Sequence, residues 1–564
     1  MSQTHPNTMH GGQILANALV RQGVEIAFGV PGESFLPLLD GLVDHQERLR
    51  FITCRQEGGA AYMAEAYAKL TGKPGVVMVT RGPGAANALI GVHTAYQDST
   101  PMVVLIGQVG TDMVEREAFQ EMDYRKVYSE CSKWVGSIDR TDRIDEFVSH
   151  AFHLAQSGRK GPVVLALPED VLFKEAQEKP TPAAQMIATG LDQTLFANAM
   201  QQFANAKRPM VIAGGGSWTK AACNALSAWA NREQVPVATS FRSQDLLDNL
   251  DPCFAGDLGI AANPALVKRV QEADMLLVIG ERLGEMTMAG YTVLTVPKPQ
   301  MPLIHVLPSP DELGRVYYAD YPICASPQAF CDALSKIFMG PQLERVQMKV
   351  AHDAYLAFSK PTTIPGPVQL SEIVSALQSH LPRNAILTNG AGNFAAFLHR
   401  FYPYGGFKSQ LAPANGSMGY GLPAAIAAKI VDPTRVAVAF CGDGDFMMNC
   451  QELATAMRYQ AKPIVIIVNN GMYGTIRMHQ ERDYPNHSSG SYLKNPSFAQ
   501  LAQAYGYAGV RITRTDEFEA AFKAAMDRKE GTLIEVMIDE DVITTRASLT
   551  TIREAAIARL AKYK

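Results

Sequence analysis

The chain has 564 residues, too many for one hydrophobic core, and its 47% hydrophobic and 19% charged residues exclude a disordered or fibrous protein. Its 51 Lys and Arg residues nearly balance 55 Asp and Glu residues, which argues against nucleic acid or an anionic membrane as a partner. The 8 cysteines show neither a CxxC pair nor regular spacing, so no zinc site or disulfide framework is predicted. Without a signal-like or membrane-spanning apolar run, we expect a cytoplasmic protein.

Short apolar runs alternate with helix-like segments in the first third of the chain. Each run has Val, Ile and other apolar residues at consecutive positions, which is typical of strands buried on both faces of a parallel sheet. The predicted strands are 26–30, 75–80, 102–107 and 163–167. A helix is predicted over 59–72, with Gly72 as its C-cap. These elements predict an α/β domain over residues 1–175.

Two further blocks repeat this alternation, each after a polar, proline-bearing stretch. Their predicted strands are 210–216, 275–280 and 302–307 in the second block, and 385–389, 436–442, 463–470 and 532–538 in the third. We predict domains over 190–345 and 365–545, and a helical tail over 546–564. The fold class is therefore α/β, with three doubly wound parallel-sheet domains, of which the first and third look alike.

Two polar residues follow neighbouring apolar runs of the third block. Asp443 comes directly after "VAVAFCG", and Asn470 ends "PIVIIVNN". Parallel strands bring their carboxyl ends to one edge of a sheet, where α/β proteins bind ligands. If the two strands are neighbours, a carboxylate and an amide meet there, and such hard oxygen ligands suit Mg²⁺ beside a phosphate. Either residue alone also fits a structural turn; together they predict a cation site.

The glycines around Asp443 favour an anion next to this cation. Gly442 and Gly444 allow the backbone to turn close to a ligand, and a helix beginning near Phe446 would offer free N–H groups. Asp445 is unexpected, because a further negative charge beside a diphosphate is unfavourable unless its side chain points away.

The GDG followed at a set distance by NN resembles the thiamine diphosphate (ThDP) motif. The resemblance implies that Asp443, Asn470 and the carbonyl of Met472 hold Mg²⁺, with Gly442, Gly444 and Asp445 in the diphosphate-binding turn. It also implies a glutamate in the first domain that exchanges a proton with the pyrimidine ring of the cofactor. Glu57, in "CRQEGGAAYMAEAYAKL", matches that glutamate, and the surrounding stretch resembles acetolactate synthases. Its structural alternative is an acid that merely suits a helix N-terminus.

Further cofactor contacts follow from the same resemblance. In "NGSMGYGLPAAIAAKI" (415–430), the carbonyl of Gly416 would accept from the pyrimidine amino group, and Met418 would bend the cofactor. Asn393 lies where relatives contact the diphosphate. Because the first and third domains of different subunits form each site in this family, the resemblance implies a homodimer or homotetramer.

The implied reaction is decarboxylation of a pyruvate-like 2-oxo acid, followed by joining of the remaining fragment to a second carbonyl. Gln108, Phe119 and Gln120 match residues that line the active site of acetolactate synthases. The alternatives are a lyase without ligation, similar to benzoylformate decarboxylase or 2-hydroxyacyl-CoA lyase, and a non-catalytic ThDP-binding partner protein. An NAD-type Rossmann protein is disfavoured, because no GxGxxG follows a strand with a later ribose-binding acid.

Several residues depart from the acetolactate synthase pattern. Glu33 stands where synthases have glycine, Arg81 where they have a small residue, Glu169 where they usually have lysine, and His479 where they have tryptophan. Glu33, Arg81 and His479 are candidates for the substrate pocket, or else surface and salt-bridge residues. The middle block has a Gly-rich turn at 214–216 but lacks the other features of FAD-binding synthases, so FAD is disfavoured.

Overall fold

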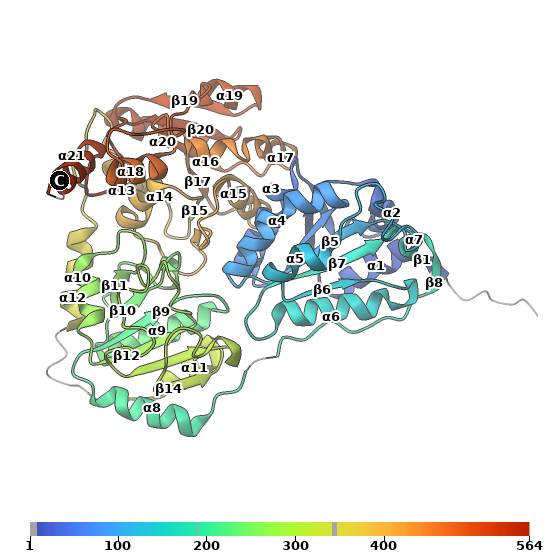
Figure 1. The fold of residues 1–564 in the computed structure, drawn as a ribbon, viewed down its shortest axis with the longest axis horizontal. Coiled ribbons are helices and arrows are strands. Elements are labelled where there is room, and N and C mark those ends of the chain that lie inside the picture. The colour runs from blue at the N-terminus through green and yellow to red at the C-terminus, as the bar shows by residue number, and fades with distance from the viewer. Residues whose placement is uncertain (1–7, 188, 341–346, 563–564) are drawn as a thin grey trace, which may run out of the picture. The chain divides into compact units, whose positions relative to one another are not determined.

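The computed structural model describes residues 8–187, 189–340 and 347–562 (Figure 1). The chain forms two compact units. Unit 1 consists of residues 1–187 with the short pieces 426–431 and 454–459, and unit 2 contains the remainder. The described residues build three six-stranded sheets, one in unit 1 and two in unit 2, in which every strand pair is parallel. The predicted α/β fold with three doubly wound sheets is confirmed.

The first sheet has the strand order β3-β2-β4-β5-β7-β6. Its strands are β2 (Ile26–Gly29), β3 (Arg50–Thr53), β4 (Gly75–Val79), β5 (Met102–Gln108), β6 (Trp134–Ser137) and β7 (Pro162–Pro168). The four predicted apolar runs are the four inner strands, and all residues of these strands are buried except Gln108 at the end of β5. The order reverses between β2 and β4, which makes their carboxyl ends the expected place for a ligand.

Helices cover this sheet on both faces. They are α1 (Gly11–Arg21), α2 (Leu36–Val43), α3 (Glu57–Thr71), α4 (Gly82–Gln97), α5 (Tyr124–Tyr128), α6 (Ile144–Gln156) and α7 (Glu169–Phe173). The predicted helix over 59–72 is α3, which begins two residues earlier and ends at Gly72, whose φ of 78° is left-handed. A small antiparallel pair, β1 (Thr8–His10) and β8 (Glu175–Gln177), ties the ends of this block together.

The third sheet, in unit 2, has the order β16-β15-β17-β18-β20-β19. Its strands are β15 (Ile386–Asn389), β16 (Gln410–Leu411), β17 (Ala437–Gly442), β18 (Ile464–Asn469), β19 (Ala508–Ile512) and β20 (Thr532–Met537). Counted along the chain, this is the same order as in the first sheet, so the expected likeness of the two blocks is confirmed. Here the order reverses between β15 and β17.

Helices also surround the third sheet. Those that lie wholly in unit 2 are α13 (Leu370–His380), α14 (Asn393–Phe401), α16 (Asp443–Met447), α18 (Gly474–Asp483), α19 (Phe498–Ala504), α20 (Phe518–Asp527) and α21 (Leu549–Ala561). The same part of the chain also contains α15 (Gly421–Val431) and α17 (Leu453–Arg458), parts of which belong to unit 1. The helix predicted to begin near Phe446 is α16, which begins earlier, at Asp443 itself, and has only 5 residues. The predicted helical tail is α21, which Arg553 ties to Glu481 of α18 at 2.8 Å.

The middle sheet, also in unit 2, has the order β11-β10-β9-β12-β13-β14. Its strands are β9 (Pro209–Ala213), β10 (Val237–Thr239), β11 (Phe254–Asp257), β12 (Met275–Ile279), β13 (Leu303–Leu307) and β14 (Tyr321–Cys324). Its helices are α8 (Gln193–Asn205), α9 (Lys220–Glu233), α10 (Pro264–Gln271) and α11 (Pro327–Leu334), and α12 (Gln347–Phe358) follows. The Gly-rich turn after β9 is explained by packing, since a Cβ on Gly214 would lie 1.9 Å from Ser240 Oγ.

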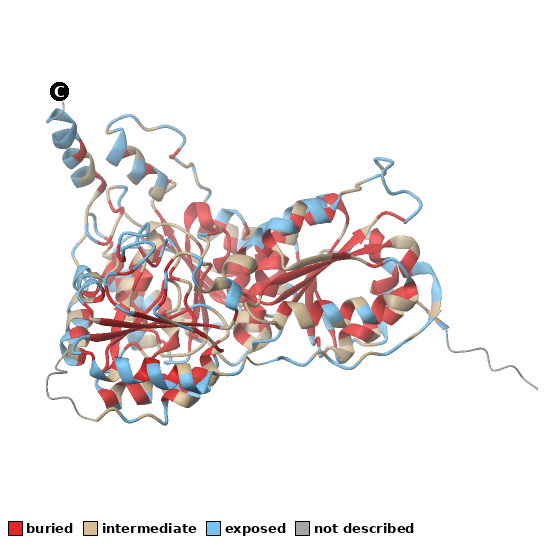
Figure 2. Cartoon of the chain, turned by 60° about the horizontal axis from the view of Figure 1, so that its bottom comes forward, coloured by how far each residue is buried: buried red, intermediate tan, exposed pale blue. Residues whose placement is uncertain are grey.

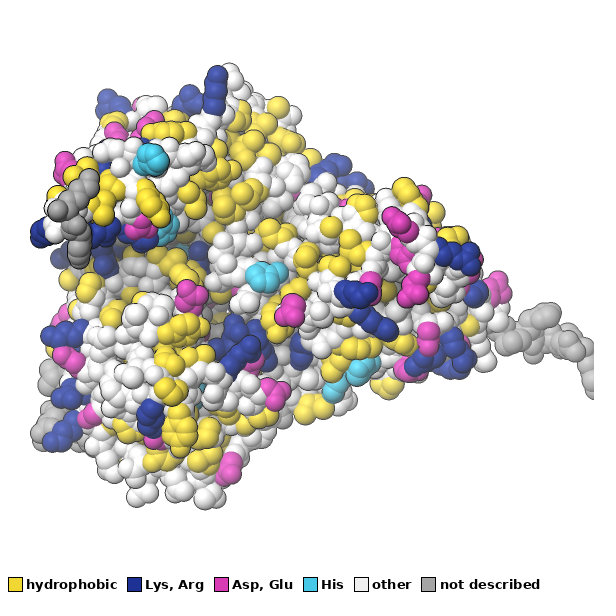
Figure 3. All heavy atoms as spheres, viewed as in Figure 1, with side chains coloured by type: hydrophobic (Ala, Val, Ile, Leu, Met, Phe, Trp, Pro, Cys, Tyr) yellow, Lys and Arg dark blue, Asp and Glu magenta, His cyan; other side chains and the backbone are white. Residues whose placement is uncertain are grey.

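Burial follows the layers of this fold. Figure 2 shows strands coloured as buried and helices that carry exposed stripes. On the face drawn in Figure 3, Lys and Arg side chains are interspersed with Asp and Glu side chains, as the near-balance of charges predicts. Among the described residues, no helix combines the length and the apolar character needed to cross a membrane.

Candidate active site

The ends of β17 and β18 bring the predicted cation ligands to one edge of the third sheet. The two strands pair in parallel, with Gly442 opposite Val468. Asp443 is only 3% exposed, and its Oδ2 accepts from Asn495 Nδ2 at 2.7 Å. The same amide nitrogen lies 3.1 Å from Asn469 Oδ1. Asn495 therefore bridges the two strand ends, a role that no sequence pattern indicated.

Asp443 is a buried carboxylic acid. Burial raises the pKa of its carboxyl group, while hydrogen bonds from Asn495 and from backbone N–H groups, including that of Gly471, act in the opposite direction. A bound cation would offset the cost of burying this charge. The other predicted ligands follow β18: Asn470 is half-buried, and Met472 is 3% exposed.

The local backbone positions these ligands. Gly471, with φ of 67°, turns the chain between Asn470 and Met472, and Asn470 Oδ1 accepts from Met472 N at 3.3 Å. One carboxylate, one amide and one carbonyl make an all-oxygen set with few protein ligands, which fits Mg²⁺. No group of three His, Cys, Asp or Glu side chains in the described part of the chain could hold a metal ion. The magnesium site itself stays a prediction.

The glycines of the GDG turn are required by aromatic rings of this chain. A Cβ on Gly442 would lie 2.7 Å from the ring of Phe394, and one on Gly444 would lie 2.5 Å from the ring of Tyr473. Close packing therefore accounts for both glycines, whether or not a ligand approaches. Their predicted contact with a diphosphate remains untested.

Asp445 turns into the protein. It is 2% exposed, and its Oδ1 accepts from Gly419 N at 2.7 Å and from Ala391 N at 3.3 Å. Burial raises the pKa of its carboxyl group to about 7, although both backbone N–H groups act to lower it. A Cβ on Gly390 would lie 1.9 Å from Asp445 Oδ1, so this position has to be glycine. Asp445 thus organises the turns after β15 and before α15.

The remaining cofactor residues predicted in unit 2, and the substrate-pocket candidate His479, lie in three places. Asn393 begins α14, and its Oδ1 accepts from Thr475 Oγ1 of α18 at 3.0 Å. Gly416 is exposed with φ of 69°, a left-handed conformation that favours glycine, and Met418 is half-buried. His479 is exposed on α18. The structure brings Asn393 close to the chain after Asn470; the roles of all four stay predictions.

In unit 1, Glu57 is the first residue of α3 and follows β3 at the carboxyl edge of the first sheet. It is half-buried, and Asn87 of α4 donates to its Oε2 at 2.9 Å. The two helices approach closely at glycines: a Cβ on Gly91 would lie 2.4 Å from Ala61 Cβ. Asn87 is a second residue that the sequence did not reveal, and it positions the carboxylate.

The three residues predicted to line the active site of unit 1 differ in their surroundings. Gln108 ends β5, and its Nε2 donates to Met122 O at 2.8 Å. Gln120, with φ of 63°, accepts at its carbonyl from Gly82 N at 3.0 Å, which places it beside the start of α4. Phe119 is 72% exposed in unit 1. A large apolar side chain so exposed is suited to contact another surface or a ligand.

Three of the departures from the synthase pattern form one cluster. Arg81, after β4, is 7% exposed and pairs with Glu33, after β2, at 3.3 Å. Its other terminal nitrogen pairs with Glu169, the first residue of α7. Glu33 and Arg81 thus form an ion pair with a buried guanidinium, and their place in the substrate pocket stays a prediction. Glu169 was noticed as a departure, yet its partner lies too far along the chain to be inferred.

Three family models of known proteins match parts of this chain, one in the region of each sheet. Residues 9–127 match the family model described as thiamine pyrophosphate enzyme, N-terminal TPP binding domain; residues 196–334 match the central domain and residues 390–536 the C-terminal TPP binding domain. A probable acetolactate synthase large subunit of Methanocaldococcus jannaschii is 31% identical, with 94% of this chain and 92% of the relative covered. The chain belongs to the acetolactate synthase-like family of thiamine pyrophosphate enzymes.

Other members of the family are similarly related to this acetolactate synthase-like enzyme. The acetolactate synthase large subunit of Lactococcus lactis is 32% identical, with coverage of 94% of this chain and 92% of the relative. The mitochondrial acetolactate synthase catalytic subunit of Saccharomyces cerevisiae is 30% identical, with coverage of 94% and 81%. The likeness therefore extends over almost the whole length of this chain.

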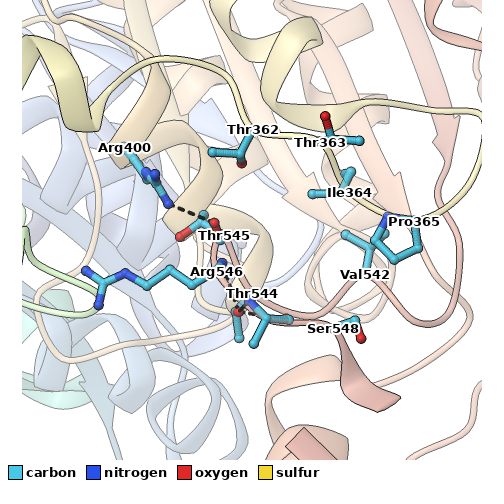
Figure 4. Close-up of a pocket in the computed structure, with 11 residues that line it drawn as sticks. Thr362, Thr363, Ile364, Pro365, Arg400, Val542, Thr544, Thr545, Arg546 and Ser548 are labelled. Carbon is cyan, nitrogen blue, oxygen red and sulfur yellow. Dashed lines mark hydrogen bonds between the residues drawn. The ribbon is translucent and has the colours of Figure 1, made fainter. Parts of the chain in front are cut away.

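A pocket of about 310 Å³ lies in unit 2, away from the residues predicted from the family motifs. It is lined by Thr362, Thr363, Ile364, Pro365, Arg400, Val542, Thr544, Thr545, Arg546, Ala547 and Ser548. Arg400 donates to the carbonyl of Thr545, and the Arg546 side chain extends away from Thr363 and Pro365 (Figure 4). The pocket thus lies between the stretch before α13 and the segment before α21.

Proposed function

We propose that this enzyme catalyses the ThDP- and Mg²⁺-dependent decarboxylation of a pyruvate-like 2-oxo acid and joins the remaining fragment to a second carbonyl compound. The observation that carries the proposal is the buried Asp443 at the end of β17, tied through Asn495 to the end of β18. The names of the relatives, all acetolactate synthases, support the reaction class.

Each predicted residue has a part in this proposal. Asp443, Asn470 and the carbonyl of Met472 hold Mg²⁺. When bound, ThDP would stabilise the negative charge that decarboxylation leaves on the carbonyl carbon of the 2-oxo acid. Glu57 exchanges a proton with the pyrimidine ring of the cofactor, and Asn87 orients its carboxylate.

The other side chains bind cofactor or substrate. Gly416, Met418, Asn393, Gly442 and Gly444 contact the cofactor, and Asp445 arranges the turns around it. Gln108, Phe119 and Gln120 line the substrate pocket, as do Glu33, Arg81 and His479. The proposal includes a cytoplasmic homodimer or homotetramer with active sites shared between subunits, and no bound FAD.

The test is product analysis after incubation of the purified protein with ThDP, Mg²⁺ and pyruvate. We expect CO₂ together with a carboligation product. Free acetaldehyde as the only organic product would replace the proposal with a non-ligating lyase. Release of no CO₂ from pyruvate or from a panel of longer 2-oxo acids would contradict the proposal and favour a binding protein without catalysis.

Gly84→Ala is expected to lower turnover about tenfold without lowering the melting temperature. A Cβ on Gly84, in α4, would lie 3.0 Å from Thr80 Cγ2 and 3.3 Å from Glu57 Oε1, so both side chains must move. Because glycine in a helix interior costs about 1 kcal/mol relative to alanine, stability should stay equal or rise. The control is Gly284→Ala, whose Cβ meets no atom within 4 Å. Equal turnover in both variants would refute the placement of Glu57.

A further inference from the structure

The cluster of Glu33, Arg81 and Glu169 (the charge triad) presents its negative charges outward. The Arg81 side chain is 9% exposed, whereas the side chains of Glu33 and Glu169 are 67% and 27% exposed. One guanidinium cannot neutralise two carboxylates, so the triad carries a net charge of −1 when all three groups are ionised. A molecule that approaches the triad therefore meets carboxylate oxygens before it meets the guanidinium.

The buried side of the triad is the guanidinium of Arg81. Arg81 Nε is buried and has no hydrogen-bond partner among the residues that the structure describes. An unsatisfied buried donor is costly, and native proteins keep few of them. Arg21, which pairs with Asp145 and Glu178, has the same unpartnered Nε, so the outward exposure of Glu33 and Glu169 is what distinguishes the charge triad.

The triad stands at the carboxyl edge of the first sheet, beside Glu57. Glu33 and Arg81 follow β2 and β4, the two strands between which the sheet order reverses. Their neighbours touch, since Ser34 Oγ and Thr80 Oγ1 are 3.0 Å apart. A Cβ added to Gly84 would lie against both Thr80 and Glu57, so these two side chains border the same space. The triad is therefore part of the surroundings of the carboxylate that the proposed reaction uses.

We propose that the charge triad selects an uncharged aldehyde, rather than a second 2-oxo acid, as the acceptor in the proposed carboligation. This inference rests on the proposed function. In the reaction, the bond between the carbonyl carbon of the donor and its carboxylate carbon breaks and releases CO₂. The electron pair left on the carbonyl carbon forms the new bond to the aldehyde carbon, and the aldehyde oxygen takes up one proton. The product is an uncharged 2-hydroxy ketone.

The physical basis of the selection is repulsion between like charges. An anionic acceptor would bring its carboxylate toward Glu33 and Glu169, whereas a neutral acceptor of the same shape would not. At the edge of a protein, two like charges several ångströms apart repel strongly enough to change a rate about tenfold. The donor also carries a carboxylate, but that group leaves as CO₂ before the acceptor reacts.

The experiment compares glyoxylate with methyl glyoxylate as acceptors, using holoenzyme loaded with ThDP and Mg²⁺ and pyruvate as donor. Both acceptors are aldehydes and they differ in charge, so the ratio of their kcat/KM values in each variant isolates the charge effect. We expect the wild-type enzyme to prefer methyl glyoxylate, and Glu33→Gln to reduce this preference about tenfold. The matched control is Glu47→Gln, at an exposed site, which should leave the ratio within about twofold.

Salt provides a second measurement that needs no variant. Raising the NaCl concentration should reduce the preference of the wild-type enzyme for methyl glyoxylate over glyoxylate, because salt screens exposed charges. The inference would be overturned if Glu33→Gln had the same ratio of kcat/KM values for the two acceptors as the wild type. It would also be overturned if the wild type preferred glyoxylate and salt did not alter that preference. If Glu33→Gln does not fold, the salt series decides alone. Failure of the proposed function gives a different result, namely no CO₂ from pyruvate with either acceptor.

Discussion

Replacing Glu57 with glutamine is expected to remove nearly all turnover of the 2-oxo acid, by a factor on the order of a thousand, while ThDP still binds. Glutamine keeps the shape of the side chain and an oxygen that can accept from Asn87 Nδ2. It cannot exchange a proton with the pyrimidine ring of the cofactor. The measurements are kcat with pyruvate and the calorimetric affinity for ThDP in the presence of Mg²⁺.

Glu65 provides a contrast on the same helix. It is 0% exposed, and its Oε1 lies 3.0 Å from Lys69 Nζ and accepts from Thr100 Oγ1 at 2.8 Å. Glu65→Gln weakens a buried ion pair, so we expect a lower melting temperature with turnover retained below it. If Glu57→Gln instead behaved like Glu65→Gln, losing stability and keeping turnover, Glu57 would be a structural acid.

The inner strands other than β10 could be predicted, because burial on both faces leaves a continuous apolar run; β10 is only 3 residues long. β17 and β18 show this pattern, with all six residues of each strand buried. The edge strands β14 and β19 lack such a continuous apolar run. β19, "AGVRI", has one buried residue, and β14, "YPIC", contains a proline that only an edge strand tolerates. Their place in the sheets follows from pairing with distant strands, which single-sequence periodicity does not encode.

The same holds for the candidate site: spacings along the chain could be predicted, whereas contacts between residues far apart in the chain could not. The spacing from Asp443 to Asn470 is a property of the sequence, and the structure brings both strand ends together. Asn495 and Asn87 were missed because each acts through a contact with a residue far along the chain. For Arg81, the sequence left open whether its charge was exposed or paired. Its two partners, 48 and 88 residues away, could be found only in the folded chain.

The glycines illustrate how one pattern can have two physical causes. The sequence pattern of the GDG turn predicts that its glycines leave space for an anion. In the structure, the rings of Phe394 and Tyr473 already fill the space beside Gly442 and Gly444. A test of the diphosphate turn therefore cannot rely on replacing these glycines, since a larger residue would disturb packing first. The cation ligands offer a cleaner experiment.

Asp443→Ala is expected to abolish Mg²⁺-dependent binding of ThDP, because it removes the only charged group of the predicted ligand set. Asp443→Asn is the sharper variant. It keeps the size of the side chain and an oxygen to accept from Asn495 Nδ2, yet it lacks the negative charge. We expect the affinity for ThDP with Mg²⁺, measured by calorimetry, to fall at least a hundredfold in both variants.

Stability separates a metal ligand from a structural acid at this position. Burial raises the pKa of Asp443, which means that the folded chain disfavours its ionised form when no cation is bound. Without metal, Asp443→Asn should therefore have a melting temperature at least equal to that of the wild type. With Mg²⁺ and ThDP present, only the wild type should gain stability, because only it binds them in the folded state. Equal affinity for ThDP in the variant, or a lower melting temperature without metal, would show that Asp443 holds the strand ends together rather than a cation.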